Sequence, residues 1–324
     1  MLTMYYIIFM YIILLTPFLS ISSSNWLILW VLMEVNLFSI MPLFTKSKSN
    51  SNSMLSESMM KYFIVQAVAS LILMVSGINL YMNLMFEGDI YWLIFSMMVF
   101  LKLGVFPLSF WVIPVLSGVN NYLIFFLLGP MKIVPLYLMY FHLNFYCNSS
   151  MMMKWMFYFI VGLSSMIIGA LVGNNMTEFR MMVGASSIAH SGWFVIASVV
   201  SGLLAYFFMY MVSLSFLLIS LMSSNMTTTA LIHCMMMLSL SGLPPFLLFY
   251  PKYLVFLNML MMQTSLVFIM IVLLSTTLSL NFYLKFSYNF ILNYVMIKSK
   301  VKKNIIYMLI FIFLSLGTSI ILLS

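Results

Sequence analysis

Charge is scarce in this chain of 324 residues. Only 6% of the residues are Asp, Glu, Lys or Arg, whereas 65% are hydrophobic. A water-soluble domain carries roughly a quarter charged residues, so the composition excludes an ordinary cytosolic enzyme, a secreted scaffold and a nucleic-acid-binding domain. The net charge of +8 does not change this, because the cations are too scattered to form a phosphate-binding face. The composition predicts an all-α polytopic membrane protein.

Residues that bind metals and redox cofactors are also few. Cys147 and Cys234 are the two cysteines, too few for a disulfide framework and too far apart for a C-x-x-C site. His142, His190 and His233 fall in three different predicted spans, which excludes a haem pair stacked along one helix. No cluster suits copper or iron, and no motif cradles a phosphate. We therefore expect no cofactor and no metal in this chain.

Arginine is almost absent. Arg180 is the single arginine, against 36 Met, 30 Phe and 19 Tyr. Met, Phe and Tyr have A/T-rich codons, whereas Arg has G/C-rich ones, so the bias predicts the product of an AT-rich organellar genome. The first cation is Lys46, so we expect no basic targeting segment at the N-terminus. A protein made inside the organelle needs no import signal.

Long apolar runs fill the remainder of the chain. A spanning helix needs about 20 apolar residues, and the loops between the runs are short, so we expect one transmembrane domain over 1–324. The eleven predicted spans are 2–21, 25–44, 58–83, 89–113, 121–142, 152–173, 178–199, 202–222, 231–257, 263–285 and 304–323.

Loop charges predict the topology. Lys46 and Lys48 follow the second span, and the basic stretch 298–303 follows the tenth, whereas Glu87 and Asp89 lie after the third. The positive-inside rule places the N-terminus on the positive side, which is the matrix in a mitochondrion. With eleven spans, the C-terminus is expected in the intermembrane space.

The fourth and ninth spans each contain glycine followed closely by proline. Gly104 precedes Pro107, and Gly242 precedes Pro244 and Pro245. Proline removes a helix hydrogen bond, so we expect two broken helices. Because they are five spans apart, they predict inverted five-helix repeats, over about 1–143 and 151–286, with an extra helix at 304–323. Paired breaks of this kind mark a transport path; the alternative is two ordinary kinked helices.

Four ionisable residues are predicted well inside spans: Glu34, Lys102, Lys132 and Lys252. Each charge at the bilayer centre costs about 2.5–3.5 kcal/mol on insertion scales, so such residues mark ion paths. A long lysine can instead snorkel to the interface. For Lys252 this alternative stays open, whereas Glu34 is too short for it.

A buried glutamate and lysine suit proton transfer. Desolvation disfavours an ammonium group, and a nearby carboxylate reverses that effect. A Glu–Lys pair that separates and rejoins therefore makes a lysine hold or release a proton, and further lysines can pass it on. Ser186, Ser187 and His190 are predicted on one helix face as bridging groups. A packed core histidine is the alternative for His190.

Six segments carry a family resemblance: Trp30–Leu37 with Pro42, Ser56–Gln66, Lys102–Pro107 with Phe110 and Trp111, Lys132–Pro135, Ser186–Trp193, and Ser241–Pro245 with Pro251 and Lys252. In their order and spacing the chain resembles the subunit 2 family of mitochondrial NADH dehydrogenase, the proton-pumping complex I, in its eleven-helix animal form. The resemblance covers nearly the whole chain.

The resemblance implies an antiporter-like proton channel in the mitochondrial inner membrane. The family's charge pair falls on Glu34 and Lys102, its connecting lysine on Lys132, its terminal lysine on Lys252, and a histidine of the hydrated axis on His190. It further implies other membrane-arm subunits as partners, including neighbouring antiporter-like subunits, together with membrane lipids. FMN, iron–sulfur clusters, NADH and ubiquinone are then expected in partner subunits.

The chain departs from the family pattern near its fourth span. The family pattern leads us to expect a histidine at position 109, where this chain has Ser109. It also leads us to expect an acidic residue near Pro114, and none is present there. Ser241 stands where the family usually has a second glycine. These departures bear on the local water path. Two other functions stay open from the residues alone, namely a stand-alone cation/proton antiporter of related fold and a membrane scaffold without transport.

Overall fold

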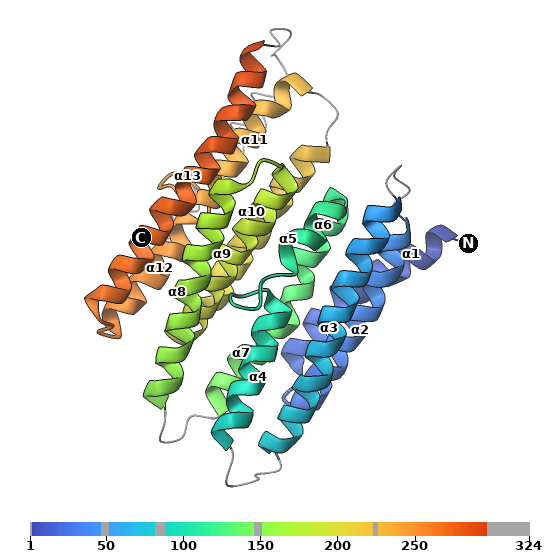
Figure 1. Ribbon diagram of the computed structural model, residues 1–324, viewed down its shortest axis with the longest axis vertical. Coiled ribbons are helices and arrows are strands. Elements are labelled where there is room, and N and C mark those ends of the chain that lie inside the picture. The colour runs from blue at the N-terminus through green and yellow to red at the C-terminus, as the bar shows by residue number, and fades with distance from the viewer. Residues whose placement is uncertain (1, 47–51, 82–87, 146–150, 223–225, 297–324) are drawn as a thin grey trace. The chain divides into compact units, whose positions relative to one another are not determined.

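The structure, a computed structural model, describes residues 2–46, 52–81, 88–145, 151–222 and 226–296 (Figure 1). The described residues form helices joined by short connections, with no strand among them, which confirms the predicted all-α class. The helices are α1 Leu2–Ser22, α2 Trp26–Lys46, α3 Asn52–Tyr81, α4 Gly88–Leu103, α5 Val112–Gly118, α6 Asn121–Leu128, α7 Pro130–Phe145, α8 Met151–Asn175, α9 Phe179–Val200, α10 Leu203–Met222, α11 Met226–Ser241, α12 Phe249–Met261 and α13 Leu266–Met296.

Eight of the described helical segments are long and apolar enough to cross a membrane. Each of the first ten predicted spans corresponds to one helix or to a pair of consecutive helices. The predicted span 304–323 lies outside the described residues, so the count of eleven stays a prediction.

The chain divides into two compact units. The first contains Met1–Phe157 and Val183–Ser191, and the second contains Tyr158–Met182 and Gly192–Ser324. The predicted single transmembrane domain and its two pseudo-repeats, over about 1–143 and 151–286, stay predictions. The inverted relation between the repeats stays a prediction.

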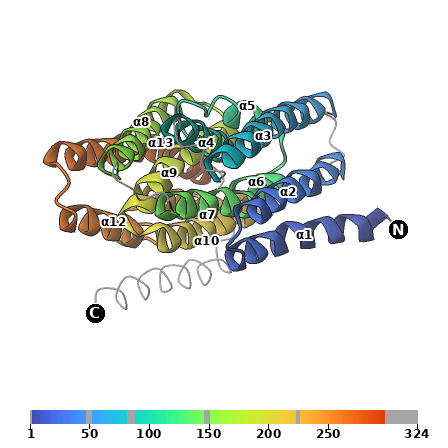
Figure 2. The same ribbon diagram turned by 90° about the horizontal axis from the view of Figure 1, so that it is seen from below.

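In the first unit, α7 packs against four other helices, α1, α2, α4 and α6. Figure 2 shows α1 running along α2 at the edge of this unit. The outward side of α1 exposes large apolar groups such as Tyr11 and Phe18, as a lipid-facing helix does. Its inward side carries Thr16, which donates a hydrogen bond to Asn36 of α2. Polar bonds between helices are a common means of association in lipid.

In the second unit, α11 packs against α13 and α10, and α10 also contacts α12. Aromatic side chains fill the space beside α10. Phe194 of α9 meets Tyr206 and Tyr210 edge to face, and Trp193 stacks on Tyr206 with 5.7 Å between ring centroids. These buried rings hold α9 and α10 together, and they place Trp193 beside the break described below.

Three helices are interrupted. The breaks between α4 and α5 and between α11 and α12 lie where the Gly–Pro pairs predicted them, and Figure 1 shows the irregular turn after α4. The predicted span 121–142 corresponds to one apolar segment, Asn121–Leu143, but its helix has an interruption that was not predicted. The chain breaks at Gly129, with φ −103° and ψ −99°, and α7 restarts at Pro130. Proline suits the first position of a helix because its missing N–H would have no helical partner.

Candidate functional site

Backbone hydrogen bonds stabilise the first helix break, which lies between α4 and α5. Gly104 has φ +73°, a conformation that side chains disfavour. Its N–H donates to the Leu101 carbonyl (3.2 Å), and the Val105 N–H donates to Phe100 (3.0 Å). This is the Schellman ending, which satisfies carbonyls left free at a helix terminus. The Trp111 indole N–H also donates to Leu101 (2.8 Å), so the turn is fixed within the apolar bundle.

Lys102 stands on the last turn of α4, beside that break. Its Nζ lies 3.9 Å from Oε1 of Glu34 on α2. The Lys102 side chain is 3% exposed and the Glu34 side chain 20%, so the lysine is enclosed while the carboxylate reaches an edge. The structure thus brings together the two residues that the sequence analysis paired.

Glu34 borders an open groove between α2 and α3. The groove has a volume of about 420 Å³, and its lining is almost entirely apolar, with Trp30, Phe38 and Leu71 among its walls. On its other side Glu34 faces Lys102. The carboxylate therefore separates an apolar outer surface from the buried lysine.

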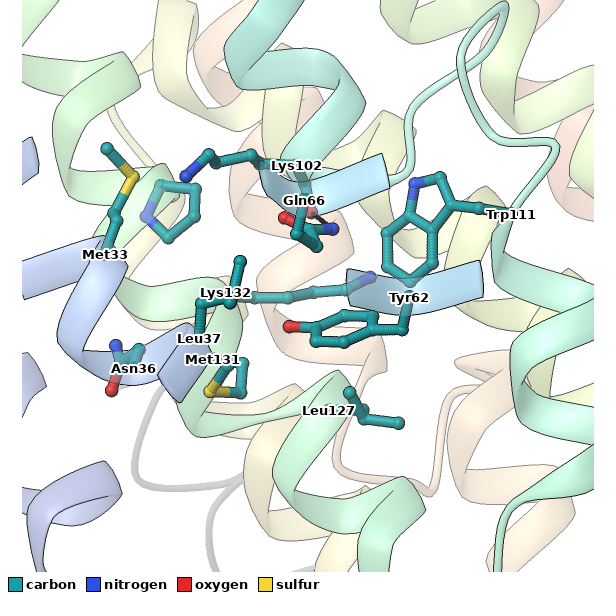
Figure 3. A pocket seen from close by; sticks show the side chains of 11 residues that line it. Met33, Asn36, Leu37, Tyr62, Gln66, Lys102, Trp111, Leu127, Met131 and Lys132 are labelled. Atoms are coloured by element: carbon teal, nitrogen blue, oxygen red, sulfur yellow. Dashed lines mark hydrogen bonds between the residues drawn. The ribbon is translucent and has the colours of Figure 1, made fainter. Parts of the chain in front are cut away.

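A small cavity joins Lys102 to Lys132. The side chains of both lysines line it, together with those of Asn36, Tyr62 and Gln66, as Figure 3 shows. The space open to the centre of a water-sized sphere is about 20 Å³. About 10–15 Å³ of such space holds one water molecule. Two buried lysines that come from different helices thus share one small cavity.

Lys132 lies in the first turn of α7, just after the break at Gly129. It is 3% exposed, and its Nζ approaches the Ser187 carbonyl of α9 at 3.5 Å, the outer limit of a hydrogen bond. Among the described contacts, Lys132 has no carboxylate partner of its own. Its ammonium group is therefore held less firmly than that of Lys102.

His190 is buried on α9, one turn beyond Ser187, with 3% of its surface exposed. The Ser186 and Ser187 hydroxyls each donate to a carbonyl one turn earlier in their own helix, at Val183 and Gly184 (both 2.8 Å). The oxygen of each hydroxyl can still accept a hydrogen bond from another donor. The structure places His190 in the same unit as Lys132 without fixing its role, so a relay histidine stays a prediction.

Lys252 lies in the second unit, in the first turn of α12. It is 6% exposed, so the snorkelling alternative is wrong for this lysine. Its Nζ donates to the Ser241 carbonyl at the end of α11 (2.7 Å) and lies 5.6 Å from the centroid of the Trp193 ring. Helix C-termini carry partial negative charge, and an indole face attracts cations. Lys252 thus holds its position without a described carboxylate partner.

Lysines near the ends of predicted spans behave differently. Lys154 pairs with Asp89 at 3.9 Å, and Lys285 donates to the Asn174 and Met176 carbonyls after α8 (3.0 and 3.1 Å). Lys61 forms an exposed pair with Glu57 on α3. These contacts are those of interfacial side chains, which separates these residues from Lys102, Lys132 and Lys252.

Sequence reasoning missed several groups of this site. Asn36, Gln66 and Trp111 lay inside recognised segments, but their partners Thr16, the Lys102 carbonyl and the Leu101 carbonyl come from other helices or from beyond the break. The one available signal was the Gly129–Pro130 dipeptide, which marks the break and is separated from Lys132 by Met131. Within the described ranges, no group of three His, Cys, Asp or Glu side chains could hold a metal ion.

A membrane bundle that buries a carboxylate–lysine pair and further lysines at helix breaks defines a class of ion-translocating membrane proteins. Comparison with known protein families supports the assignment to this class. The model of the family described as NADH:quinone oxidoreductase/Mrp antiporter, TM, matches residues 23–279. Two solved structures share the fold: respiratory complex I from Thermus thermophilus (TM-score 0.75, 17% identity, 100% of this chain and 79% of that one) and the Mrp complex from Dietzia sp. (TM-score 0.71, 15% identity, 80% and 55%).

Curated relatives narrow the class. The chain is 38% identical to NADH-ubiquinone oxidoreductase chain 2 of Albinaria caerulea, over 84% of each chain. It is 33% identical to the protein of that name from Locusta migratoria, over 82% of this chain and 79% of the relative. The chain therefore belongs to the NADH-ubiquinone oxidoreductase chain 2 family, within the NADH:quinone oxidoreductase and Mrp antiporter membrane proteins.

Proposed function

We propose that the chain is a core membrane subunit of the proton-pumping NADH:ubiquinone oxidoreductase, respiratory complex I, in the mitochondrial inner membrane. The names and coverage of its relatives support this proposal. The observation that carries the mechanism is the contact between Glu34 and Lys102 at the break after α4. An ion pair at a helix terminus inside a bilayer serves charge movement better than it serves stability.

Redox energy released in other subunits changes the Glu34–Lys102 pairing. When the carboxylate separates from the ammonium group, desolvation favours release of a proton from Lys102. Lys132 shares the cavity with Lys102 and takes up the proton. Lys252, in the second unit, is the terminal lysine of the path, and His190 is a residue of the hydrated axis.

Other membrane-arm subunits, including neighbouring antiporter-like subunits, and membrane lipids are the partners of this chain. FMN, iron–sulfur clusters, NADH and ubiquinone belong to the partner subunits, so the chain acts in the enzyme as a translocating subunit and carries no redox site. It forms one transmembrane domain of two inverted five-helix repeats plus a final helix. Its N-terminus lies in the matrix and its C-terminus in the intermembrane space.

Native-gel migration after mild detergent extraction tests the assembly. In-gel NADH oxidation and mass spectrometry of the band should place the chain with flavin and iron–sulfur subunits. Migration as a small particle without NADH activity, while the complex itself is intact, would remove the chain from complex I.

Proton pumping by a Lys102→Met variant in inner-membrane vesicles tests the mechanism. We expect assembly at the normal level with impaired pumping and impaired coupled turnover. Lys61→Met is the matched control, because it removes an exposed lysine of the same unit. Normal pumping by the assembled Lys102→Met complex would contradict the proposed role of the Glu34–Lys102 pair.

The stand-alone cation/proton antiporter is the second candidate, and the fold shared with the Mrp complex is the observation that favours it. It predicts cation-dependent proton exchange by the purified chain in liposomes. The scaffold without transport offers no reason for the buried charges, and it predicts normal pumping after Glu34, Lys102, Lys132 and Lys252 are all neutralised.

A further inference from the structure

Asn36 of α2 is a buried amide with its two ends in different surroundings. It is 2% exposed, and its Oδ1 accepts a hydrogen bond from the Thr16 hydroxyl of α1. Its Nδ2 is also buried and has no hydrogen-bond partner among the described residues. A buried amide N–H₂ without a partner carries a desolvation penalty. Asn36 therefore needs a hydrogen-bond acceptor beside its Nδ2 atom.

The cavity between Lys102 and Lys132 supplies the place for that acceptor. Asn36 lines this cavity, and Figure 3 shows its amide on the same side as Met33, below the Lys102 side chain. The space holds about one water molecule, and Gln66 and Tyr62 add polar atoms around it. A buried water typically makes about three hydrogen bonds, so this lining is sufficient to order one.

We propose that Asn36, held by Thr16, is a positioning residue that orients the water through which a proton passes between Lys102 and Lys132. This inference rests on the proposed function. Because the Thr16 hydroxyl occupies Oδ1, the amide presents N–H donors to the cavity. The water must then turn one oxygen lone pair toward Asn36, which leaves its second lone pair for the Lys102 ammonium and an O–H group for the Lys132 amine.

Proton transfer through such a water is balanced. The Lys102 ammonium gives a proton to the water oxygen while the water gives one of its protons to the neutral Lys132 amine. Lys102 ends neutral, Lys132 ends as an ammonium group, and the water is unchanged. A water turned by 180° would present its oxygen to Lys132 and could not donate to it. The orientation set by Asn36 therefore decides whether the step occurs.

Thr16 acts only through Asn36. It stands on α1, whose opposite side faces outward, and of the acceptors its hydroxyl reaches, Asn36 is nearer than the Ile13 carbonyl. Without the hydroxyl, the amide is free to turn over and present its oxygen to the cavity. A change on α1 should thus alter proton transfer at lysines that stand on α4 and α7.

The test compares Asn36→Leu, Thr16→Val and Thr16→Ser in whole complex I in inner-membrane vesicles. Leucine keeps the branched shape of asparagine and removes its N–H donors and its carbonyl acceptor. Valine keeps the shape of threonine and removes the hydroxyl, whereas serine keeps the hydroxyl. We expect Asn36→Leu to slow coupled proton pumping about threefold to tenfold, the rate equivalent of one hydrogen bond. Thr16→Val should slow it less, and Thr16→Ser should pump normally.

Two further readouts separate positioning from a structural tie between α1 and α2. The solvent deuterium isotope effect on coupled turnover should rise in Asn36→Leu and Thr16→Val, because the relay step becomes rate-limiting. The Thr16→Val/Asn36→Leu double variant should match Asn36→Leu alone. Ser20→Ala is the matched control, because its buried hydroxyl donates to Pro17 of its own helix. Assembly is checked in each variant by in-gel NADH oxidation.

An unchanged isotope effect, or additive losses in the double variant, would overturn the positioning role. If Lys102→Met is impaired while Asn36→Leu and Thr16→Val pump normally, this inference fails and the proposed function stands. If the assembled Lys102→Met complex pumps normally, the proposed translocating role of the Glu34–Lys102 pair fails, and this inference fails with it.

Discussion

Lys252 reaches back across the second break to donate to the backbone carbonyl of Ser241, with 2.7 Å between the two atoms. The first unit uses a different arrangement, because Lys102 faces the carboxylate of Glu34. Both lysines stand at a break, yet one is balanced by an ionisable group and the other by a helix end. The partner of Lys102 is therefore a side chain that can separate from it, whereas the partner of Lys252 is a carbonyl of the backbone.

Glu34→Gln should impair pumping in the assembled complex. The amide keeps the shape of the side chain but leaves the buried Lys102 ammonium without its carboxylate, and breaking a buried pair from one side is costly. We expect coupled proton pumping to fall about tenfold or more, equivalent to about 1.4 kcal/mol on the barrier. Glu57→Gln removes an exposed carboxylate of the same unit and should pump normally. Equal rates for the two variants would contradict this prediction.

Gly242→Ala should displace Lys252. Gly242 has φ +76°, and a Cβ atom there would lie 2.9 Å from the Lys252 Nζ and 2.8 Å from its Cδ. A side chain in this conformation costs about 1–2 kcal/mol, and the lysine must also leave the Ser241 carbonyl. We expect reduced pumping, measured with vesicles as above. Gly202→Ala is the control, because its Cβ would meet only Val255, at 3.3 Å.

Lys132→Arg should fail to pump although it keeps the positive charge. Arginine is effectively always protonated, so it cannot release a proton to the next group. A lysine needed only for its charge would be rescued by arginine, and a proton carrier would not. Lys285→Arg is the control, since Lys285 is exposed and bonds to the carbonyls after α8. Normal pumping by the assembled Lys132→Arg complex would show that Lys132 does not carry the proton.

Trp111→Phe should loosen the turn after α4. The change removes the indole N–H that donates to Leu101, a loss of about 1 kcal/mol. We expect coupled turnover to be inactivated at a lower temperature. In the control Trp30→Phe the lost partner is the Ser70 carbonyl inside α3, where the helix already supplies a hydrogen bond. A larger loss in the control would contradict the role given to Trp111.

The sequence was sufficient for the two breaks that contain both a positive-φ glycine and a proline, because that pair of residue types cannot continue a helix. It failed at Gly129, where a proline at the start of α7 looks like part of a longer apolar run. Burial of Lys252 could not be predicted either. A lysine near the end of a span can reach the interface or turn inward, and the Ser241 carbonyl and Trp193 ring that decide the outcome come from other helices.

Polar side chains that act between helices were the hardest to predict. Asn36 stands two positions beyond Glu34, and no local pattern identifies Thr16, twenty residues earlier, as its partner. Serine hydroxyls such as those of Ser186 and Ser187 donate their hydrogen bonds to backbone carbonyls of their own helix. Such groups take on a role only when the bundle brings two helices together, which a single sequence does not specify.

The turn after α4 is made of parts that do not titrate. Its hydrogen bonds come from the Gly104 and Val105 amides and from the Trp111 indole, all of which keep their protons at any physiological pH. Gain or loss of a proton at Lys102 therefore removes none of the bonds that hold the turn. The backbone of the turn therefore keeps its hydrogen bonds in either charge state of Lys102. An effect of that charge on neighbouring groups must then be exerted through side chains.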